Sequence, residues 1–159
     1  GCGGVGRTFA CEAALAGCEI VNAVRDADLA AGEALLEYVR ALKPGAACTL
    51  TTLNRLEGPF DLLINATPVG MYPHADASPV TAGLLHDVKA VFDAVYNPGR
   101  TRLLTEAEAA GCRAVGGMAM LVWQAAAAHT IWYGAEFSDA AIAQLITDAD
   151  TEMQRRYGG

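Results

Sequence analysis

The feature that most constrains the fold is a set of short apolar runs in which polar and apolar residues do not alternate. The clearest is FDLLIN at 60–65, and a second run covers 88–95. Continuous apolar runs of this length are typical of strands that are buried on both faces of a parallel sheet. Segments with helical patterns separate the runs. The sequence therefore predicts an α/β domain, a Rossmann-like parallel sheet with flanking helices.

Turn and cap residues divide the chain into alternating elements. Helices are expected over 5–16, 28–42, 101–110, 117–133 and from 138 onward, and strands over 20–24, 46–50, 60–65, 88–95 and 113–115. One face of the second helix carries Leu35, Leu36, Val39 and Leu42. The helix over 117–133 is apolar nearly all round, which predicts that it is buried. A loop rich in proline and glycine is expected over 67–79.

A glycine-rich loop opens the chain and leads directly into the first expected helix. Gly1, Gly3 and Gly6 fit the pattern G-x-G-x-x-G. In dinucleotide-binding folds the first glycine makes a tight turn, the second lets the backbone approach a pyrophosphate, and the third packs the helix against its strand. The amino end of the helix also favours phosphate. The loop indicates a dinucleotide site, although a glycine-rich turn before a helix is often only a turn.

No strand precedes this loop, although the pattern requires one. In the Rossmann strand order that strand lies in the middle of the sheet. Without it, both neighbouring strands would keep unpaired backbone groups, each costing roughly 1–3 kcal/mol against a total stability of about 5–15 kcal/mol. We therefore expect residues 1–159 to be a dinucleotide-binding domain with C-terminal helices. Its first strand is expected to be truncated, and the chain to be a fragment of a longer protein.

The second nucleotide signal is Arg25, which follows the expected strand over 20–24. An arginine at this place binds the 2′-phosphate of NADP, whereas a carboxylate binds the ribose hydroxyls of NAD. Asp26 and Asp28 favour NAD because they would repel a phosphate. The non-functional alternative is a solvated charge cluster that leads into a helix cap.

Charge and composition exclude several classes of protein. The chain has 11 basic and 18 acidic residues and a net charge of -7, which argues against nucleic acid and anionic membranes as partners. No apolar run reaches the roughly 18 residues of a membrane span. Five cysteines without a C-x-x-C pair favour reduced thiols in a cytoplasmic protein. The three histidines show no metal spacing, so no metal is expected. The sequence is compatible with a homodimer but does not define the oligomeric state.

Four segments together resemble the shikimate dehydrogenase family, and specifically its C-terminal NADP-binding domain. The glycine loop with Arg7 resembles that family's G-A-G-G-A-x-R. Residues 65–71 (NATPVGM) are similar to its N-A-T-S-x-G-M, and residues 92–98 (FDAVYNP) resemble its D-x-x-Y-x-P. Residues 116–125 resemble its G-G-x-G-M-L-x-x-Q-A. The segments follow the family's order, and the resemblance covers nearly the whole chain.

The resemblance implies roles for individual residues. Those expected to bind the cofactor are Gly1, Gly3, Gly4, Val5, Arg25, Asn65, Thr67, Gly117 and Met120. Arg25 matches the arginine of the family's N-R-T motif, which binds the 2′-phosphate of NADP, while Val24 and Asp26 replace the Asn and Thr. A second phosphate-facing arginine of many members corresponds to Leu29, and Ala119 replaces a usual glycine.

The resemblance also places substrate contacts in this chain. Gln124 is expected to form hydrogen bonds with substrate hydroxyls, and Tyr96 to contact the substrate from the pocket wall. The family's catalytic Lys–Asp pair belongs to an N-terminal substrate domain that this sequence lacks, so no catalytic residue is expected here.

Asp93 ends a buried strand and is expected to accept backbone N–H bonds in the next turn, a structural role.

The full-length parent is thus expected to be an NADP-dependent shikimate dehydrogenase. Such an oxidoreductase transfers a hydride between NADP and shikimate or 3-dehydroshikimate, in the chorismate pathway of aromatic amino acid biosynthesis. The isolated chain is expected to be inactive. Two alternatives stay open. One is an NAD-dependent quinate/shikimate dehydrogenase, which Asp26 and Leu29 favour and Arg25 opposes. The other is a non-catalytic sensor module that binds NAD or NADP.

Overall fold

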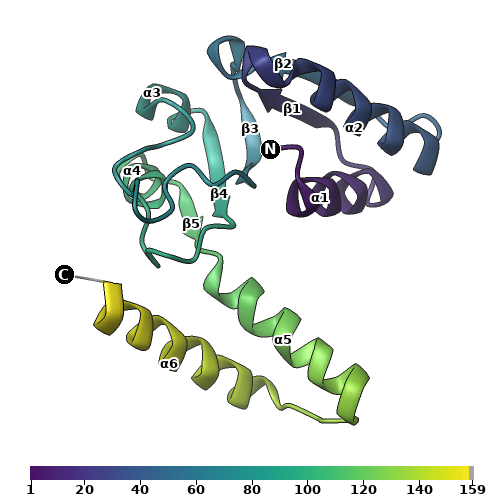
Figure 1. Ribbon diagram of the computed structural model, residues 1–159. Coiled ribbons are helices and arrows are strands. Elements are labelled where there is room, and N and C mark those ends of the chain that lie inside the picture. Colours follow the sequence, from purple (N-terminus) through teal and green to yellow (C-terminus); the bar gives the residue numbers. More distant parts are fainter. Residues whose placement is uncertain (158–159) are drawn as a thin grey trace.

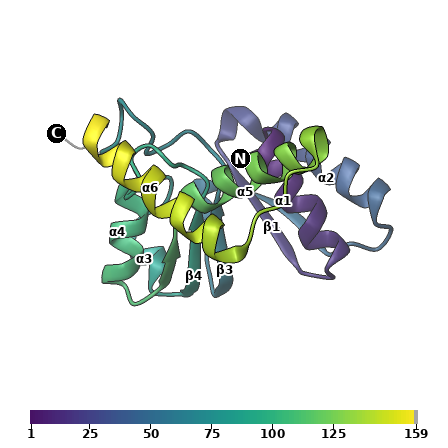
Figure 2. The same cartoon turned by 90° about the horizontal axis from the view of Figure 1, so that it is seen from below.

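The computed structural model describes residues 1–157, which form an α/β structure with parallel strands and flanking helices (Figures 1 and 2). The helices are α1 (Gly4–Leu15), α2 (Leu29–Leu42), α3 (Ala82–Leu85), α4 (Arg102–Ala109), α5 (Met118–Tyr133) and α6 (Asp139–Tyr157). The strands are β1 (Ile20–Val24), β2 (Cys48–Thr52), β3 (Phe60–Asn65), β4 (Val88–Asp93) and β5 (Arg113–Val115). The predicted fold class is confirmed.

The strands form two separate parallel sheets within residues 1–157. One sheet has the order β1-β2, with Ile20 opposite Cys48 and Val24 opposite Thr52, and the other has the order β3-β4-β5. In this part of the chain β1 and β3 each pair on one side only. Together the two sheets reproduce the Rossmann order with its middle position open, as the sequence predicts.

The open position is a strand gap between β1 and β3. Two grooves, of about 560 and 500 Å³, share the residues that line this gap: Gly1, Val21, Asn22, Phe60, Leu62, Ile64 and Ala66. Apolar side chains in the middle of both strands face open space, since Val21 is 38% and Leu62 is 52% exposed. The amino end of the chain lies at the gap (Figure 1).

Element boundaries follow the local turn chemistry. Gly17 and Gly111 follow α1 and α4 in the left-handed region, at φ +78° and +87°, where glycine is favoured. The strand expected over 46–50 begins two residues later, at Cys48, because the Ala46 amide still donates to the Lys43 carbonyl in the turn after α2. Helix α3 was not predicted, because its four residues are too few to show a helical period.

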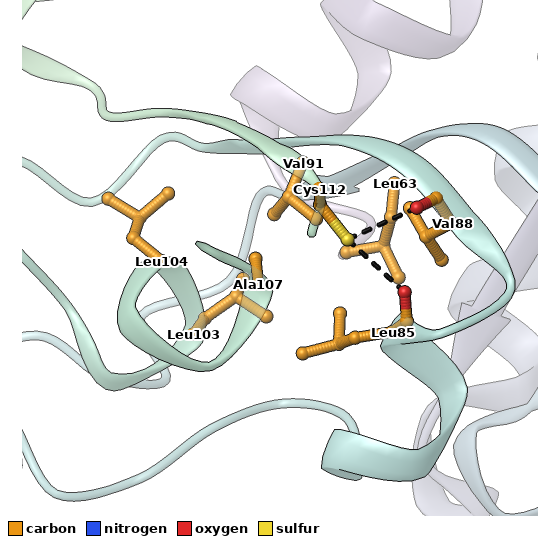
Figure 3. Packing of buried hydrophobic residues seen from close by; sticks show 8 residues of the cluster. All are labelled: Leu63, Leu85, Val88, Val91, Leu103, Leu104, Ala107 and Cys112. Carbon is orange, nitrogen blue, oxygen red and sulfur yellow. Dashed lines mark hydrogen bonds between the residues drawn. The ribbon is translucent and has the colours of Figure 1, made fainter. Parts of the chain in front are cut away.

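Each sheet has its own core. The β3-β4-β5 core contains Leu63, Leu85, Val88, Val91, Leu103, Leu104, Ala107 and Cys112 (Figure 3). The Cys112 thiol donates to the carbonyl oxygens of Leu85 and Val88, at 3.2 and 3.1 Å. The second core joins α1, α2 and β2 through Ala10, Ala14, Leu35, Leu36, Val39 and Cys48. Leu42, predicted for the same face of α2, is 43% exposed because it ends the helix.

The prediction that α5 is buried is wrong. Only Met118 and Ala126 are buried in this helix, whereas Ile131 and Trp132 are 80% and 69% exposed. Helix α5 packs mainly against α6, and the pair stands away from the sheets (Figure 1). A helix that is apolar all round is buried only where other elements cover every side of it. Within residues 1–157, α5 is covered mainly on one side, by α6.

No helix in this range is long and apolar enough to cross a membrane.

Candidate functional site

The larger groove, of about 560 Å³, gathers five of the predicted site residues. Gly1 and Gly3 line it from the glycine loop, Arg25 from the end of β1, and Asn65 and Thr67 from the end of β3. Arg25, Asn65 and Thr67 lie at the carboxyl ends of β1 and β3, where ligands bind in open α/β sheets. The fold thus joins segments that are about 65 residues apart in the sequence.

The glycines of the loop fall into two structural classes. A Cβ atom on Gly1 would lie 2.5 Å from the Ala66 carbonyl oxygen, and one on Gly6 would lie 2.0 Å from the Gly1 carbonyl oxygen. These two positions therefore require glycine for close backbone packing. A Cβ on Gly3 or Gly4 would meet no atom within 4 Å. The backbone there faces open space, as the approach of a pyrophosphate requires.

Helix α1 presents its amino end at this loop. Gly3 is the N-cap residue and supplies no side chain to the first-turn N–H groups. Such N–H groups lack partners within the helix and carry a partial positive charge, so they suit a phosphate. Gly4 and Val5 form the first turn itself. They do not line the larger groove, and Val5 is 40% exposed.

Arg25 is held by a carboxylate in the same groove. Its Nε lies 2.5 Å from Oδ2 of Asp28. Asp28 occupies the N-cap position of α2 but makes no side-chain cap bond. Its carboxylate accepts a hydrogen bond from Arg25 instead. The hydrogen bond from Arg25 lowers the pKa of Asp28 below its ordinary value of 3.8. Asp26, which was expected together with Asp28 to repel a phosphate, does not line the groove.

Asn65 shapes the loop after β3 through all of its polar atoms. Its Nδ2 donates to the Val69 carbonyl (3.1 Å) and to Oδ1 of Asp93 (2.9 Å). Its Oδ1 accepts from the amide (3.1 Å) and the hydroxyl (2.6 Å) of Thr67. The Thr67 hydroxyl in turn accepts from the Val69 amide. Asn65 thereby fixes the backbone of residues 65–69 beside the groove.

Asp93 is the buried centre of this network. It is 0% exposed and accepts hydrogen bonds from Asn65, from the Val95 amide (3.0 Å) and from the Thr101 hydroxyl (2.6 Å). The predicted structural role, to accept a backbone N–H in the following turn, is confirmed. Burial raises the pKa of Asp93, and the three hydrogen bonds act in the opposite direction. Thr101 also caps α4 by accepting from the Leu104 amide at 3.3 Å.

The other predicted site residues lie at a second location, around the end of β4 and the start of α5. The Gly117 amide donates to the Val95 carbonyl at 3.2 Å, and a Cβ on Gly117 would lie 2.3 Å from the Ala94 carbonyl oxygen. Met120 is half-buried, while Tyr96 and Gln124 are exposed. None of these four predicted residues, Tyr96, Gly117, Met120 and Gln124, lines the larger groove.

Sequence reasoning missed several residues of the larger groove. Leu53 and Leu56 form part of its wall, directly after β2. Their place after the carboxyl end of a parallel strand was the signal that could have identified them. Asp28 was expected to cap a helix and, with Asp26, to repel a phosphate, but its ion pair with Arg25 was not predicted. No group of three or more His, Cys, Asp or Glu side chains in residues 1–157 is placed to hold a metal ion.

Comparisons with known proteins point in one direction. The chain is 42% identical over 138 residues to the shikimate dehydrogenase (NADP(+)) of Methanosarcina mazei, an alignment that covers 86% of this chain and 49% of the relative. A solved shikimate dehydrogenase in complex with NADP+ superposes with a TM-score of 0.80 at 35% identity, over 93% of this chain and 52% of that one. No protein-family model matches the chain.

A second solved structure differs in its cofactor. The quinate dehydrogenase of Corynebacterium glutamicum, in complex with NAD, superposes with a TM-score of 0.79 at 27% identity, over 96% of this chain and 53% of that one. The chain spans about half the length of the curated relatives that it matches.

Proposed function

This chain is a relative of the shikimate dehydrogenases, and on that premise we propose that it is the nucleotide-binding part of an NADP-dependent oxidoreductase of this kind. The observation that carries the proposal is the larger groove. It brings Gly3, Arg25 and Thr67 together at the carboxyl ends of two parallel strands. Neither the loop nor the arginine is specific alone, but their meeting in one groove favours a dinucleotide.

The residues in the groove fit NADP. Open space at Gly3 and Gly4 admits the pyrophosphate to the amino end of α1. The Arg25 side chain is 75% exposed, and its planar guanidinium is suited to bidentate binding of a 2′-phosphate. When bound, NADP would supply or accept the hydride. The chain's own residues bind the cofactor and orient it.

We propose that the second location completes the site. There Gly117 and Met120 would contact the nicotinamide end of the cofactor, and Tyr96 and Gln124 would contact the substrate. The contact of Gly117 with Ala94 supports this assignment, because it fixes the start of α5 against the end of β4. The substrate would be shikimate or 3-dehydroshikimate. We assign no catalytic residue, because the Lys–Asp pair of the family has no counterpart at the described sites. The five free cysteines support a cytoplasmic location.

A second candidate is an NAD-dependent enzyme acting on quinate or shikimate. The ion pair between Arg25 and Asp28 favours it, since the guanidinium already has an anionic partner. The structural likeness to a quinate dehydrogenase in complex with NAD also agrees with it.

The test is the activity of the full-length protein that carries this segment. Absorbance of the reduced nicotinamide would be followed with shikimate or quinate, each paired with NADP or NAD. We expect reduction with shikimate and NADP. Reduction mainly with NAD would move the proposal to the second candidate. Nucleotide binding without any reduction would favour a sensor module and overturn the proposed oxidoreductase. In the same full-length protein, Gln124→Ala should raise KM for shikimate while leaving the affinity for NADP unchanged.

A further inference from the structure

The Arg25–Asp28 pair bears directly on which dinucleotide the groove accepts. Both residues line the larger groove, with Gly1 and Gly3 on the adjacent wall. Arg25 is the only basic residue among the residues described as lining it, and Asp28 the only acidic one. A 2′-phosphate that bound Arg25 would therefore come close to the carboxylate of Asp28.

The pair is not required for the fold around it. Asp28 makes no cap bond to α2, although it occupies the N-cap position where such a bond is expected. The side chains of Arg25 and Asp28 are 75% and 38% exposed. Exposed ion pairs contribute little to stability. The orientation of Asp28 toward Arg25 therefore matters more for a ligand in the groove than for folding.

Building on the proposed function, we infer that Asp28 determines the balance between NADP and NAD. With NADP, the carboxylate competes with the 2′-phosphate for the Arg25 guanidinium and repels the phosphate charge. With NAD, there is no phosphate to repel, and the carboxylate can accept hydrogen bonds from the ribose hydroxyls. Arg25 alone would make the site bind NADP more tightly than NAD. Asp28 weakens NADP binding and supports NAD binding, so it reduces this preference for NADP.

Asp26 provides a matched control. It carries the same charge and adjoins Arg25 in the sequence, but it lies outside the groove lining and forms no ion pair with Arg25. If only the overall electrostatic potential mattered, removing the charge of Asp26 or of Asp28 would change nucleotide affinity by the same factor. If Asp28 acts through its position in the groove, only the Asp28 variant would change the preference between nucleotides.

The experiment measures binding of two probes, 2′,5′-ADP and 5′-AMP, by calorimetry to the full-length protein that carries this segment. Asp28→Asn should raise the affinity for 2′,5′-ADP relative to 5′-AMP by about 5- to 10-fold, the effect of removing one exposed opposing charge from a doubly charged phosphate. Asp26→Asn should change this ratio less than about twofold. Asp28→Ser, which also suits an N-cap position, should reproduce the result if Asp28→Asn folds poorly.

The outcomes separate the inference from the proposed function. An increased ratio for the Asp28 variants alone supports the inference. Binding of both probes with an unchanged ratio, or with equal changes for Asp26→Asn and Asp28→Asn, overturns the role of Asp28 and leaves the nucleotide site intact. If the folded full-length wild type bound neither probe, both the nucleotide site and the inference would be rejected.

Discussion

Asp93 should be the most sensitive polar position in the chain. In Asp93→Ala, the Val95 amide, the Thr101 hydroxyl and one hydrogen of the Asn65 amide lose their buried acceptor. Asn65 keeps its bond to the Val69 carbonyl. Each buried donor left without an acceptor costs about 1–3 kcal/mol. Removal of a carboxylate whose burial is unfavourable offsets part of this loss.

We therefore expect Asp93→Ala to lower the free energy of unfolding by about 3 kcal/mol, which corresponds to a fall in Tm of roughly 6–12 °C for a domain of this size. Asp93→Asn is the matched control. Its amide oxygen can accept from Asn65 and Val95, and its amide group can donate to the Thr101 hydroxyl. We expect this variant to lose less than about 1 kcal/mol. Urea denaturation followed by circular dichroism measures both values.

The pH dependence gives an independent check on Asp93. Because burial raises its pKa above the ordinary value of 3.8, the folded state binds this proton more tightly than the unfolded state. The free energy of unfolding of the wild type, relative to Asp93→Asn, should therefore fall as the pH rises from 3.8 through the raised pKa, and then stay constant. Equal stability of the Ala and Asn variants, or a relative stability that rises with pH in this window, would refute the assignment.

Other positions give sharper local tests. Gly6→Ala should lower the free energy of unfolding by about 1–3 kcal/mol, because the new Cβ meets the Gly1 carbonyl. Gly3→Ala should unfold like the wild type, because its Cβ meets no atom, yet bind NADP at least about tenfold more weakly in calorimetry, because the Cβ occupies the open space at the loop. Gly117→Ala should cost about 2 kcal/mol in urea denaturation through its contact with the Ala94 carbonyl, and wild-type stability would contradict that packing. An apolar extension of about six residues fused ahead of Gly1 should raise Tm by pairing with both edges of the strand gap, and a Gly/Ser extension of equal length should not.

Sequence patterns predicted the sheets well where the signal was local. β1 and β3 occur at the predicted residues, because short apolar runs between turn residues have few alternative structures. The open middle position of the sheet followed from the glycine loop, which requires a strand before it. Buried β4 was predicted too long by two residues, because Ala94 and Val95 continue the apolar pattern into the turn.

What the sequence could not show depends on contacts between distant segments. The apolar surface of α5 predicted burial, but composition does not reveal whether a neighbour covers each side. The pairing of Asp28 with Arg25 was equally hidden, since a residue at an N-cap position can bond either to its own helix or to a nearby side chain. The role of Thr101 as a donor to Asp93 depends on the turn after β4, which brings the two side chains to 2.6 Å.

The measurement that tests the central claim most directly is hydrogen exchange of this segment within the full-length protein, with and without NADP. We expect slower exchange over residues 1–3, around Arg25 and over 65–69, because these segments line one groove beside the carboxyl ends of β1 and β3. Arg25→Gln should reduce the protection obtained with NADP more than that obtained with NAD. Unchanged exchange at saturating NADP, or protection confined to α6, would contradict the assignment of this groove as the dinucleotide site.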